Sequence, residues 1–337
     1  MTGANSLHAR DEAERTLSRC VMIDGDRVEL LVDCVLQQQP EQMRRSVVET
    51  LRLHLKDMGG PEHLVGGILS AGESAHVVGY AMHYAGRLAM LSGPRIIGQA
   101  ERGNEAVTTL TNLLCETAVS RWKPELIQTT LSSGEPDGPL RAARFRPLAD
   151  LHQLRLDLKS SAAAELSAAA SGRWRIYDEP QREAYLRWLD STYRGTLDCP
   201  ELNSLRGTAD ALEGYLMAAR GGLARHHAPA ATQLPHWWAL YDTPPGGTDT
   251  AGEIIAACMT TPVSPESWEL SYVGVASGHR RCGYGRQAVR FAVDRLRQLN
   301  AVEAIIYVDV RNVPAIAMYE KLGFERTDTY SVYYRRG

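Results

Sequence analysis

The stretch "GVASGHRRCGYGRQAVRFAVDRL", residues 274–296, joins a glycine-rich turn to a segment with helical periodicity. The start of such a helix presents unpaired backbone N–H groups at the positive end of the helix dipole. Gly283 and Gly285 lack Cβ atoms, so an anion can approach the backbone of the turn closely. Three arginines add positive charge around it: Arg280, Arg281 and Arg286. The turn is therefore predicted to hold a phosphate or pyrophosphate group.

The segments around the turn predict strands and helices in a recurring order. In the second half, strands are expected at 253–260, 268–275, 304–310 and 329–336, and helices at 286–299 and 313–322, with Gly323 ending the second helix. The apolar face of the first helix consists of Ala288, Val289, Ala292, Val293, Leu296 and Leu299. In the first half, strands are expected at 76–84, 88–96, 126–131 and 151–158, and helices at 106–122 and 140–147. Both halves are thus predicted to be of the α/β class.

Two landmarks indicate that the halves are copies of one unit. Gly103 lies 180 residues before Gly283, and Phe145 lies 179 residues before Phe324, so one register fits both. This agreement favours a tandem repeat over a coincidence between two generic α/β halves. Small residues at 159–172 suit a linker, which predicts domains at 1–160 and 173–337.

Composition narrows the class of protein. Among 337 residues the net charge is −3, which supports neither nucleic acid nor a membrane as partner. The six cysteines have no ligand-like spacing, so neither zinc nor a disulfide framework is expected, and no metal is predicted. The N-terminus lacks a signal pattern, and no run of about 18 apolar residues occurs. A cytoplasmic monomer or homodimer is expected.

The glycine turn alone also fits a dinucleotide fingerprint, with Gly283, Gly285 and Ala288 filling G-x-G-x-x-A. The context does not fit. In that fold the glycines follow the strand almost at once, whereas here the spacer "ASGHRRC" intervenes and too few residues follow for the rest of the sheet.

The motif R-x-x-G-x-G, from Arg280 to Gly285, is preceded by "ELSYVGV" and followed by "VDVRNVPAIAMYEKLGFE". Over residues 236–330 this order resembles the GNAT superfamily of acetyltransferases, which bind acetyl-coenzyme A. The resemblance implies two tandem GNAT-like domains, each a mixed, mostly antiparallel sheet flanked by helices. It implies that the pyrophosphate of the cofactor lies on the turn. The implied cofactor-binding residues are Val273, Gly274, Val275, Arg280, Arg281, Cys282, Gly283, Tyr284, Gly285, Arg286 and Asn312, the last of these also an N-cap.

The same resemblance implies two proton carriers. Glu269 lies fourteen residues before Gly283, the spacing at which several members carry a general base. If 268–275 is a regular strand, Glu269, Ser271, Val273 and Val275 share one face. Tyr319 occupies the position of the general acid that protonates the coenzyme A thiolate. The chain is therefore expected to transfer acetyl from acetyl-CoA to an unidentified amine acceptor. The alternative is a coenzyme A-binding regulatory module with little catalysis.

At the equivalent positions of the first half, the residues lack the side chains proposed to bind the cofactor or transfer protons. Arg280 corresponds to Ala100, Glu269 to Ala89, Gly285 to Glu105 and Tyr319 to Leu140. A carboxylate at the turn would repel a pyrophosphate, so the first domain is predicted to be a degenerate copy without a coenzyme A site.

The remaining histidines, tryptophans and acidic residues that stand out in the second half are expected to be mainly structural. His226, His227 and His236 are expected to be loop residues, and Trp237 and Trp238 core residues at the start of a strand. In the segment 192–216, Asp198, Glu201, Asp210 and Glu213 either attract a cationic amine or are simply exposed at the surface.

Overall fold

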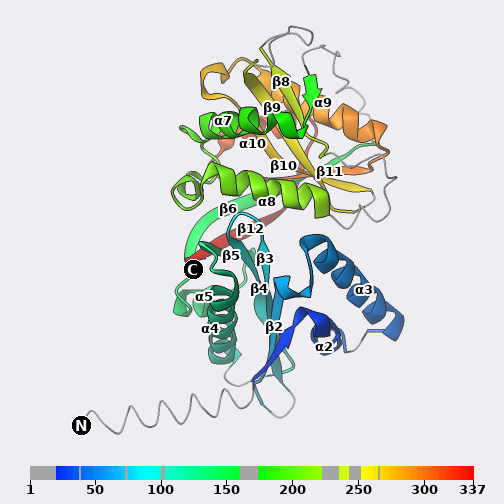
Figure 1. Cartoon of the computed structure of the whole chain (residues 1–337), viewed down its shortest axis with the longest axis vertical. Coiled ribbons are helices and arrows are strands. Elements are labelled where there is room, and N and C mark those ends of the chain that lie inside the picture. The colour runs from blue at the N-terminus through cyan, green and yellow to red at the C-terminus, as the bar shows by residue number, and fades with distance from the viewer. Residues whose placement is uncertain are drawn as a thin grey trace, which may run out of the picture. The chain divides into compact units, whose positions relative to one another are not determined.

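The computed structural model describes residues 20–37, 39–72, 75–99, 103–159, 174–221, 235–242, 252–264 and 266–337. The chain forms two compact units (Figure 1). The first unit contains Met1–Arg146 and Tyr333–Gly337, and the second contains Pro147–Val332. Of the predicted features, Ala100, His226, His227 and almost all of the linker at 159–172 lie outside the described residues. No described helix is both long and apolar enough to cross a membrane.

The sheet of the first unit follows the order β1-β2-β3-β4-β5. The strands are β1 (Cys20–Asp24), β2 (Leu64–Ser70), β3 (His76–Tyr84), β4 (Leu88–Ile97) and β5 (Leu126–Ser132). Neighbouring strands are antiparallel except β4 and β5, which are parallel. The parallel step follows from the crossover helix between β4 and β5.

Helices cover both faces of this sheet. They are α2 (Val28–Val35), α3 (Glu41–Met58), α4 (Gly103–Trp122) and α5 (Gly138–Ala142). Two adjacent glycines of β2 show which helix lies on which face. A Cβ on Gly66 would meet Leu31 of α2, whereas a Cβ on Gly67 would meet Leu110 of α4. Since neighbouring residues of a strand point to opposite faces, α2 and α4 lie on opposite sides of the sheet.

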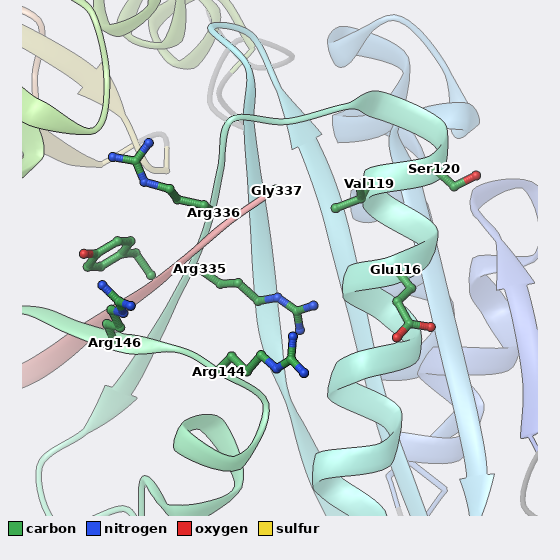
Figure 2. A pocket seen from close by; sticks show the side chains of 9 residues that line it. Glu116, Val119, Ser120, Arg144, Arg146, Arg335, Arg336 and Gly337 are labelled. Atoms are coloured by element: carbon green, nitrogen blue, oxygen red, sulfur yellow. The ribbon is translucent and has the colours of Figure 1, made fainter. Parts of the chain in front are cut away.

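The last residues of the chain complete the first unit. The Tyr333 hydroxyl donates to Asp137 Oδ2 at 2.8 Å, and the backbone N–H of Gly337 donates to the carbonyl of Glu125 at 3.2 Å. Tyr333 also belongs to the apolar core between α4 and the sheet. Figure 2 shows Arg335 and Arg336 on this terminal stretch, with the Arg335 side chain extending towards α4.

The second unit repeats the plan with two more strands. The strands are β6 (Arg146–Asp157), β7 (Trp174–Ile176), β8 (Trp238–Tyr241), β9 (Ile254–Pro262), β10 (Ser267–Val275), β11 (Glu303–Asp309) and β12 (Glu325–Arg336). Their order is β12-β6-β11-β10-β9-β8-β7. In the registers described, β10 and β11 are parallel and the other pairs are antiparallel. The predicted fold class, a mixed and mostly antiparallel sheet with helices, is confirmed.

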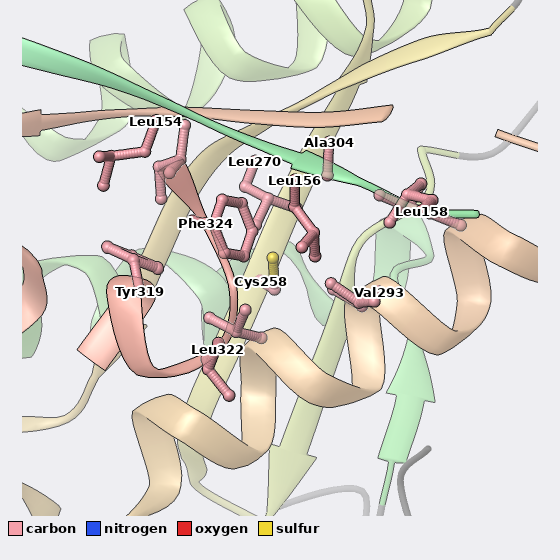
Figure 3. Close-up of a cluster of buried hydrophobic side chains, with 14 of the residues drawn as sticks. Leu154, Leu156, Leu158, Cys258, Leu270, Val293, Ala304, Tyr319, Leu322 and Phe324 are labelled. Carbon is pink, nitrogen blue, oxygen red and sulfur yellow. The ribbon is translucent and has the colours of Figure 1, made fainter. Parts of the chain in front are cut away.

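Two pairs of helices enclose the sheet of the second unit. They are α7 (Arg182–Tyr193) with α8 (Thr208–Gly221), and α9 (Tyr284–Gln298) with α10 (Val313–Lys321). On β9, Cys258 belongs to the core beneath α9 and α10, and the next residue, Met259, to the core beneath α7 and α8. Figure 3 shows the first of these cores, in which Leu154, Leu270 and Phe324 gather around Cys258. The predicted apolar face of α9 is buried except Leu299, which is 36% exposed because it follows the last helical residue.

The division of the chain differs from the predicted one. The boundary lies at Arg146, not near residue 160, and Tyr333–Gly337 return to the first unit. The reason is the pairing of β6, which runs antiparallel to β11 from Leu151 opposite Asp309 to Asp157 opposite Glu303. The strand that ends the first half of the sequence is thus part of the second unit.

Candidate functional site

The central feature of the second unit is a separation of β10 and β11. Their parallel pairing covers only Ser267–Glu269 opposite Glu303–Ile305. Beyond it, residues of both strands line a cavity of about 540 Å³, including Leu270–Val275 and Ile306–Val308. The edge of β10 that faces this cavity is outside the described pairing with β11, so its backbone N–H and C=O groups are available to an extended ligand.

A β-bulge changes the direction of side chains along β10. Leu270 pairs with Thr260 but Tyr272 pairs with Met259, so Ser271 is the extra residue. Leu270 and Val273 pack with the core beneath α9 and α10, whereas Tyr272 packs with α7 and α8. The expectation that Glu269, Ser271, Val273 and Val275 share one face is therefore wrong, because the bulge breaks the alternation before Val273.

The glycine turn has the backbone geometry of an anion nest. Arg281 and Gly283 have φ of 64° and 83°, so left-handed residues alternate in the turn. Gly283 precedes Tyr284, the first residue of α9, and a Cβ on Gly283 would meet no atom within 4 Å. Several turn residues line the cavity: Arg280, Arg281, Gly283, Gly285 and Arg286. The cavity thus leads from the first turn of α9 to the gap between β10 and β11.

Two residues predicted in this turn lie beside the cavity instead of lining it. Cys282 is exposed, and its thiol donates to the Arg280 carbonyl at 3.4 Å. The Tyr284 ring packs against His279 and the core containing Val273 and Val275. Only backbone groups of Cys282 and Tyr284 are placed where a phosphate on the nest could reach them.

The Arg280 side chain forms hydrogen bonds within the protein. Its Nη2 donates to the Thr192 carbonyl at 2.6 Å and its Nη1 to the Gly195 carbonyl at 3.0 Å. Nε makes a longer contact of 3.4 Å with the Val275 carbonyl. The guanidinium therefore fastens the segment after α7 to the glycine turn, which leaves the positive charge of Arg281 and Arg286 for a ligand.

Gly274 is needed for close packing on β10. A Cβ there would come within 2.7 Å of Trp188, 2.9 Å of Thr192 and 2.9 Å of Tyr272. Thr192 and Tyr272 are also joined by a hydrogen bond of 2.7 Å between their hydroxyl groups. This contact holds α7 against the bulged part of β10.

Glu269 is the last residue of β10 that pairs with β11, so it marks the closed end of the gap. The residues that line the cavity begin with Leu270, its neighbour. Burial raises the pKa of the Glu269 carboxyl above its usual range, and a hydrogen bond from Ser271 opposes this effect. Such a carboxyl can accept a proton at a higher pH than an exposed glutamate.

Tyr319 reaches the same cavity from α10. It is 4% exposed and packs against Phe324, with ring centroids 5.6 Å apart (Figure 3). Burial, and secondarily the nearby charge of Asp198, raises the pKa of its hydroxyl well above 10. The hydroxyl therefore keeps its proton at neutral pH.

Asn312 caps α10, as predicted. Its side-chain oxygen accepts from the Ala315 N–H at 3.4 Å. Its side chain also hydrogen-bonds to the Asp198 carboxylate, which lines the cavity. Asn312 and Asp198 thus connect the start of α10 to the segment after α7.

Sequence reasoning missed a carboxylate network at the end of β11. The Asp309 N–H donates to Asp198 Oδ1 at 2.8 Å, and the Cys199 N–H donates to Asp309 Oδ2 at 3.0 Å. Arg311 donates to the buried Asp309 at 2.6 Å and to both oxygens of Glu201 at 2.6 and 2.8 Å. The only sequence signal is the Asp-x-Arg spacing of Asp309 and Arg311.

Of the four acidic residues named above, Asp198 lines the cavity, whereas Glu201, Asp210 and Glu213 do not. Arg311 lowers the pKa of Glu201 to about 2, and Glu213 forms an ion pair with Arg182. Asp198 lines the cavity, and burial raises the pKa of its carboxyl. Asp198 is therefore the member of this group that a ligand in the cavity can meet. His236, expected in a loop, packs against Trp238 and Trp268 just before β8.

In the first unit, the positions equivalent to the site carry apolar or repulsive groups. Ala89 and Leu140 are buried in the core. Glu105 lies in the first turn of α4, where the second unit has Gly285. These placements agree with the hypothesis of a copy without a coenzyme A site.

The second unit is similar in sequence to known acetyltransferases. Residues 209–324 match the model of the acetyltransferase (GNAT) family. Among curated relatives, a mycothiol acetyltransferase of Corynebacterium glutamicum is 38% identical over 81 residues, which is 24% of this chain and 28% of the relative. One from Kocuria rhizophila is 40% identical over 63 residues, 19% of this chain and 21% of the relative. The matched stretch thus spans less than a third of either relative.

Solved structures show the same fold over most of the chain. A GCN5-related N-acetyltransferase from Sphaerobacter thermophilus has a TM-score of 0.57 at 14% identity and covers 94% of this chain and 96% of its own. A tandem GNAT protein from the clavulanic acid biosynthesis pathway has a TM-score of 0.53 at 15% identity, covering 94% and 98%. The fold is therefore that of tandem GNAT proteins.

Proposed function

We propose that the protein transfers acetyl from acetyl-CoA to an amine by direct attack in a ternary complex, the chemistry suggested by the match of residues 209–324 to the acetyltransferase (GNAT) family model. One observation carries the proposal. A single cavity runs from the anion nest before α9 to the gap between β10 and β11, with Tyr319 in its wall and Glu269 at its closed end.

The cavity suits the shape and charge of acetyl-CoA. The pyrophosphate would accept hydrogen bonds from the backbone of Gly283–Gly285, with Arg281 and Arg286 nearby. The extended pantetheine arm would pair with the free edge of β10 between Val273 and Val275. The Val273 N–H would then face the thioester carbonyl and stabilise the oxyanion that develops on it.

Proton transfer is assigned to two groups with opposite tasks. An amine that enters as a cation first releases one proton to solvent; its nitrogen then attacks the carbonyl carbon, and Glu269 takes the second proton, directly or through water. The C–S bond then breaks, and the leaving thiolate takes the proton of the Tyr319 hydroxyl. The raised pKa values of Glu269 and Tyr319 fit a base that works near neutral pH and an acid that stays protonated.

The acceptor is proposed to enter beside Thr192–Asp198, the segment that Arg280 fastens to the turn. The Asp198 carboxylate would attract an amine in its cationic form. The curated relatives are named mycothiol acetyltransferases, so the amine that those enzymes acetylate is the first acceptor to test.

The test has two stages, both on the full chain. Calorimetry with acetyl-CoA measures binding, and a thiol-release assay across amine classes, starting with the acceptor of the relatives, measures transfer. Micromolar binding with turnover on one amine class supports the proposal. Binding with no turnover on any class would favour a coenzyme A-binding module, and no binding at all would overturn both.

A further inference from the structure

A second cavity lies wholly within the first unit, apart from the cofactor cavity of the second unit. It has a volume of about 560 Å³, within the usual range of small-molecule sites. Four arginines line it: Arg144, Arg146, Arg335 and Arg336. Glu116 of α4 is the carboxylate side chain among its lining residues. The lining side chains therefore carry more positive than negative charge.

Among the residues that the structure describes, several arginines of the first unit are paired with carboxylates, unlike those of the cavity. In the same unit, Arg44, Arg87 and Arg141 each form an ion pair with a carboxylate. Within the described parts of the chain, none of the four arginines of the cavity forms an ion pair at 4.0 Å or less. Like charges held together without counter-ions repel one another, so an anion would stabilise the arrangement.

The backbone at Arg144 indicates that a guanidinium is specifically placed here. Arg144 has φ of 66°, in the left-handed region that favours glycine. In the repeat register the equivalent residue of the second unit is Gly323, with φ of 87°. The first unit thus carries an arginine, at a cost in backbone strain, where the second unit uses the residue best suited to the turn.

The Arg335 side chain is held in place by the protein. Arg335 Nη1 donates to Asn112 Oδ1 at 3.0 Å and to the Ala143 carbonyl at 3.1 Å. Figure 2 shows the side chains of Arg144 and Arg335 on the side of the terminal strand that faces α4 and Glu116, whereas those of Arg146 and Arg336 extend to the other side. Because Arg335 is fixed by two hydrogen bonds, part of the site is already ordered before any ligand binds.

We propose that this cavity binds a small molecule carrying at least two linked phosphate groups. Guanidinium groups match phosphate oxygens in two-point hydrogen bonds, and several of them suit a group with more than one negative charge. Val119 and Tyr334 add apolar surface for the remainder of the molecule. The proposal does not rest on acetyl transfer, and the first unit would contribute a ligand site of its own.

The test is calorimetric titration of the full chain, repeated in the Gly285→Glu variant, in which a carboxylate blocks the phosphate-binding turn of the second unit without any added acetyl-CoA. The probes are ATP and inorganic pyrophosphate, which separate a nucleotide from the phosphates alone, and citrate, a carboxylate polyanion. Binding of ATP or pyrophosphate that weakens as salt is added is the expected result. Failure of both phosphate probes to bind, or citrate binding equally tightly, would overturn the proposal.

Substitutions test whether the phosphate probes bind in this cavity. Arg144→Gly and Arg336→Gln should each weaken binding roughly tenfold, the loss of about one charged hydrogen bond. Arg144→Gly should also keep or raise the midpoint of thermal unfolding, because glycine relieves the left-handed backbone. Arg95→Gln removes an exposed arginine of the same unit outside the cavity and should leave the affinity unchanged. Unchanged affinity in both cavity variants, or an equal loss in Arg95→Gln, would refute the site.

Discussion

Replacing Arg280 by methionine distinguishes a structural arginine from a phosphate ligand. In the structure the guanidinium donates to the carbonyls of Thr192 and Gly195, at 2.6 and 3.0 Å. Hydrogen bonds from charged groups contribute about 1.5–3 kcal/mol each, and partial exposure of Arg280 reduces this to ~1 kcal/mol. The Arg280→Met variant should therefore lose about 2 kcal/mol of unfolding free energy.

The two roles predict different effects on ligands. If the backbone of the turn holds the pyrophosphate, Arg280→Met should change the affinity for acetyl-CoA by less than about threefold. It should raise the KM of the acceptor, because the segment Thr192–Asp198 is no longer fastened to the turn. A direct phosphate contact would instead cost at least ~1.5 kcal/mol of binding free energy, more than tenfold in Kd.

Arg281→Gln is the matched control on the neighbouring residue. The exposed Arg281 lines the cavity, so its loss should weaken acetyl-CoA binding while the unfolding free energy changes by no more than about 0.5 kcal/mol. The measurements are urea unfolding, calorimetry with acetyl-CoA and steady-state kinetics. A stable Arg280→Met protein with cofactor affinity reduced more than tenfold would refute the structural role of Arg280.

Three further predictions concern the strand, the turn and the base. Gly274→Ala should lower the unfolding free energy by about 1–3 kcal/mol in urea titrations, because its Cβ overlaps Trp188, Thr192 and Tyr272; an unchanged midpoint would contradict this packing. Gly285→Glu should cost at least ~2 kcal/mol of acetyl-CoA binding by calorimetry without unfolding the protein, since a carboxylate would meet the pyrophosphate, whereas the reciprocal Glu105→Gly should create no activity. Glu269→Gln should lower turnover by ~10²–10⁴ near neutral pH, with partial recovery at high pH, where the amine deprotonates itself. Because the folded-state pKa of Glu269 is raised, stability falls as pH rises through it, so Glu269→Gln should unfold at a higher urea concentration at neutral pH. Near-normal neutral turnover in that variant would place the base elsewhere.

Local patterns in the sequence were sufficient for most elements near the site. The turn motif, the apolar spacing of α9 and the stop at Gly323 predict helices within two residues of their observed ends. These features depend on neighbours in the chain, such as the left-handed φ of 83° at Gly283. The helices α2 and α3 went unpredicted, because no motif marks them.

Features that depend on distant partners were not predicted. The bulge at Ser271 shows only in the pairing of β10 with β9, since "WELSYVGV" alternates as a regular strand would. The Arg280 guanidinium donates to the backbone carbonyls of Thr192 and Gly195, and backbone groups leave no side-chain pattern in the sequence. The roles of the site residues remain predictions that the experiments above test.

The position of β6 shows why the second half of the sequence needs the first half in order to fold. β6 belongs to the first half by sequence, yet its seven paired positions cover the outer edge of β11. β11 supplies Ile306–Val308 to the cavity wall and ends at Asp309, which orders the segment around Asp198. A chain cut in the linker at 159–172 would lose β6, expose that edge to water and aggregation, and loosen the wall of the site. A cut after Arg146 would keep β6 but separate Tyr333–Gly337 from α4 and β5. Each half of the sequence therefore completes the fold of the other, and this structural requirement does not depend on whether the first half binds a cofactor.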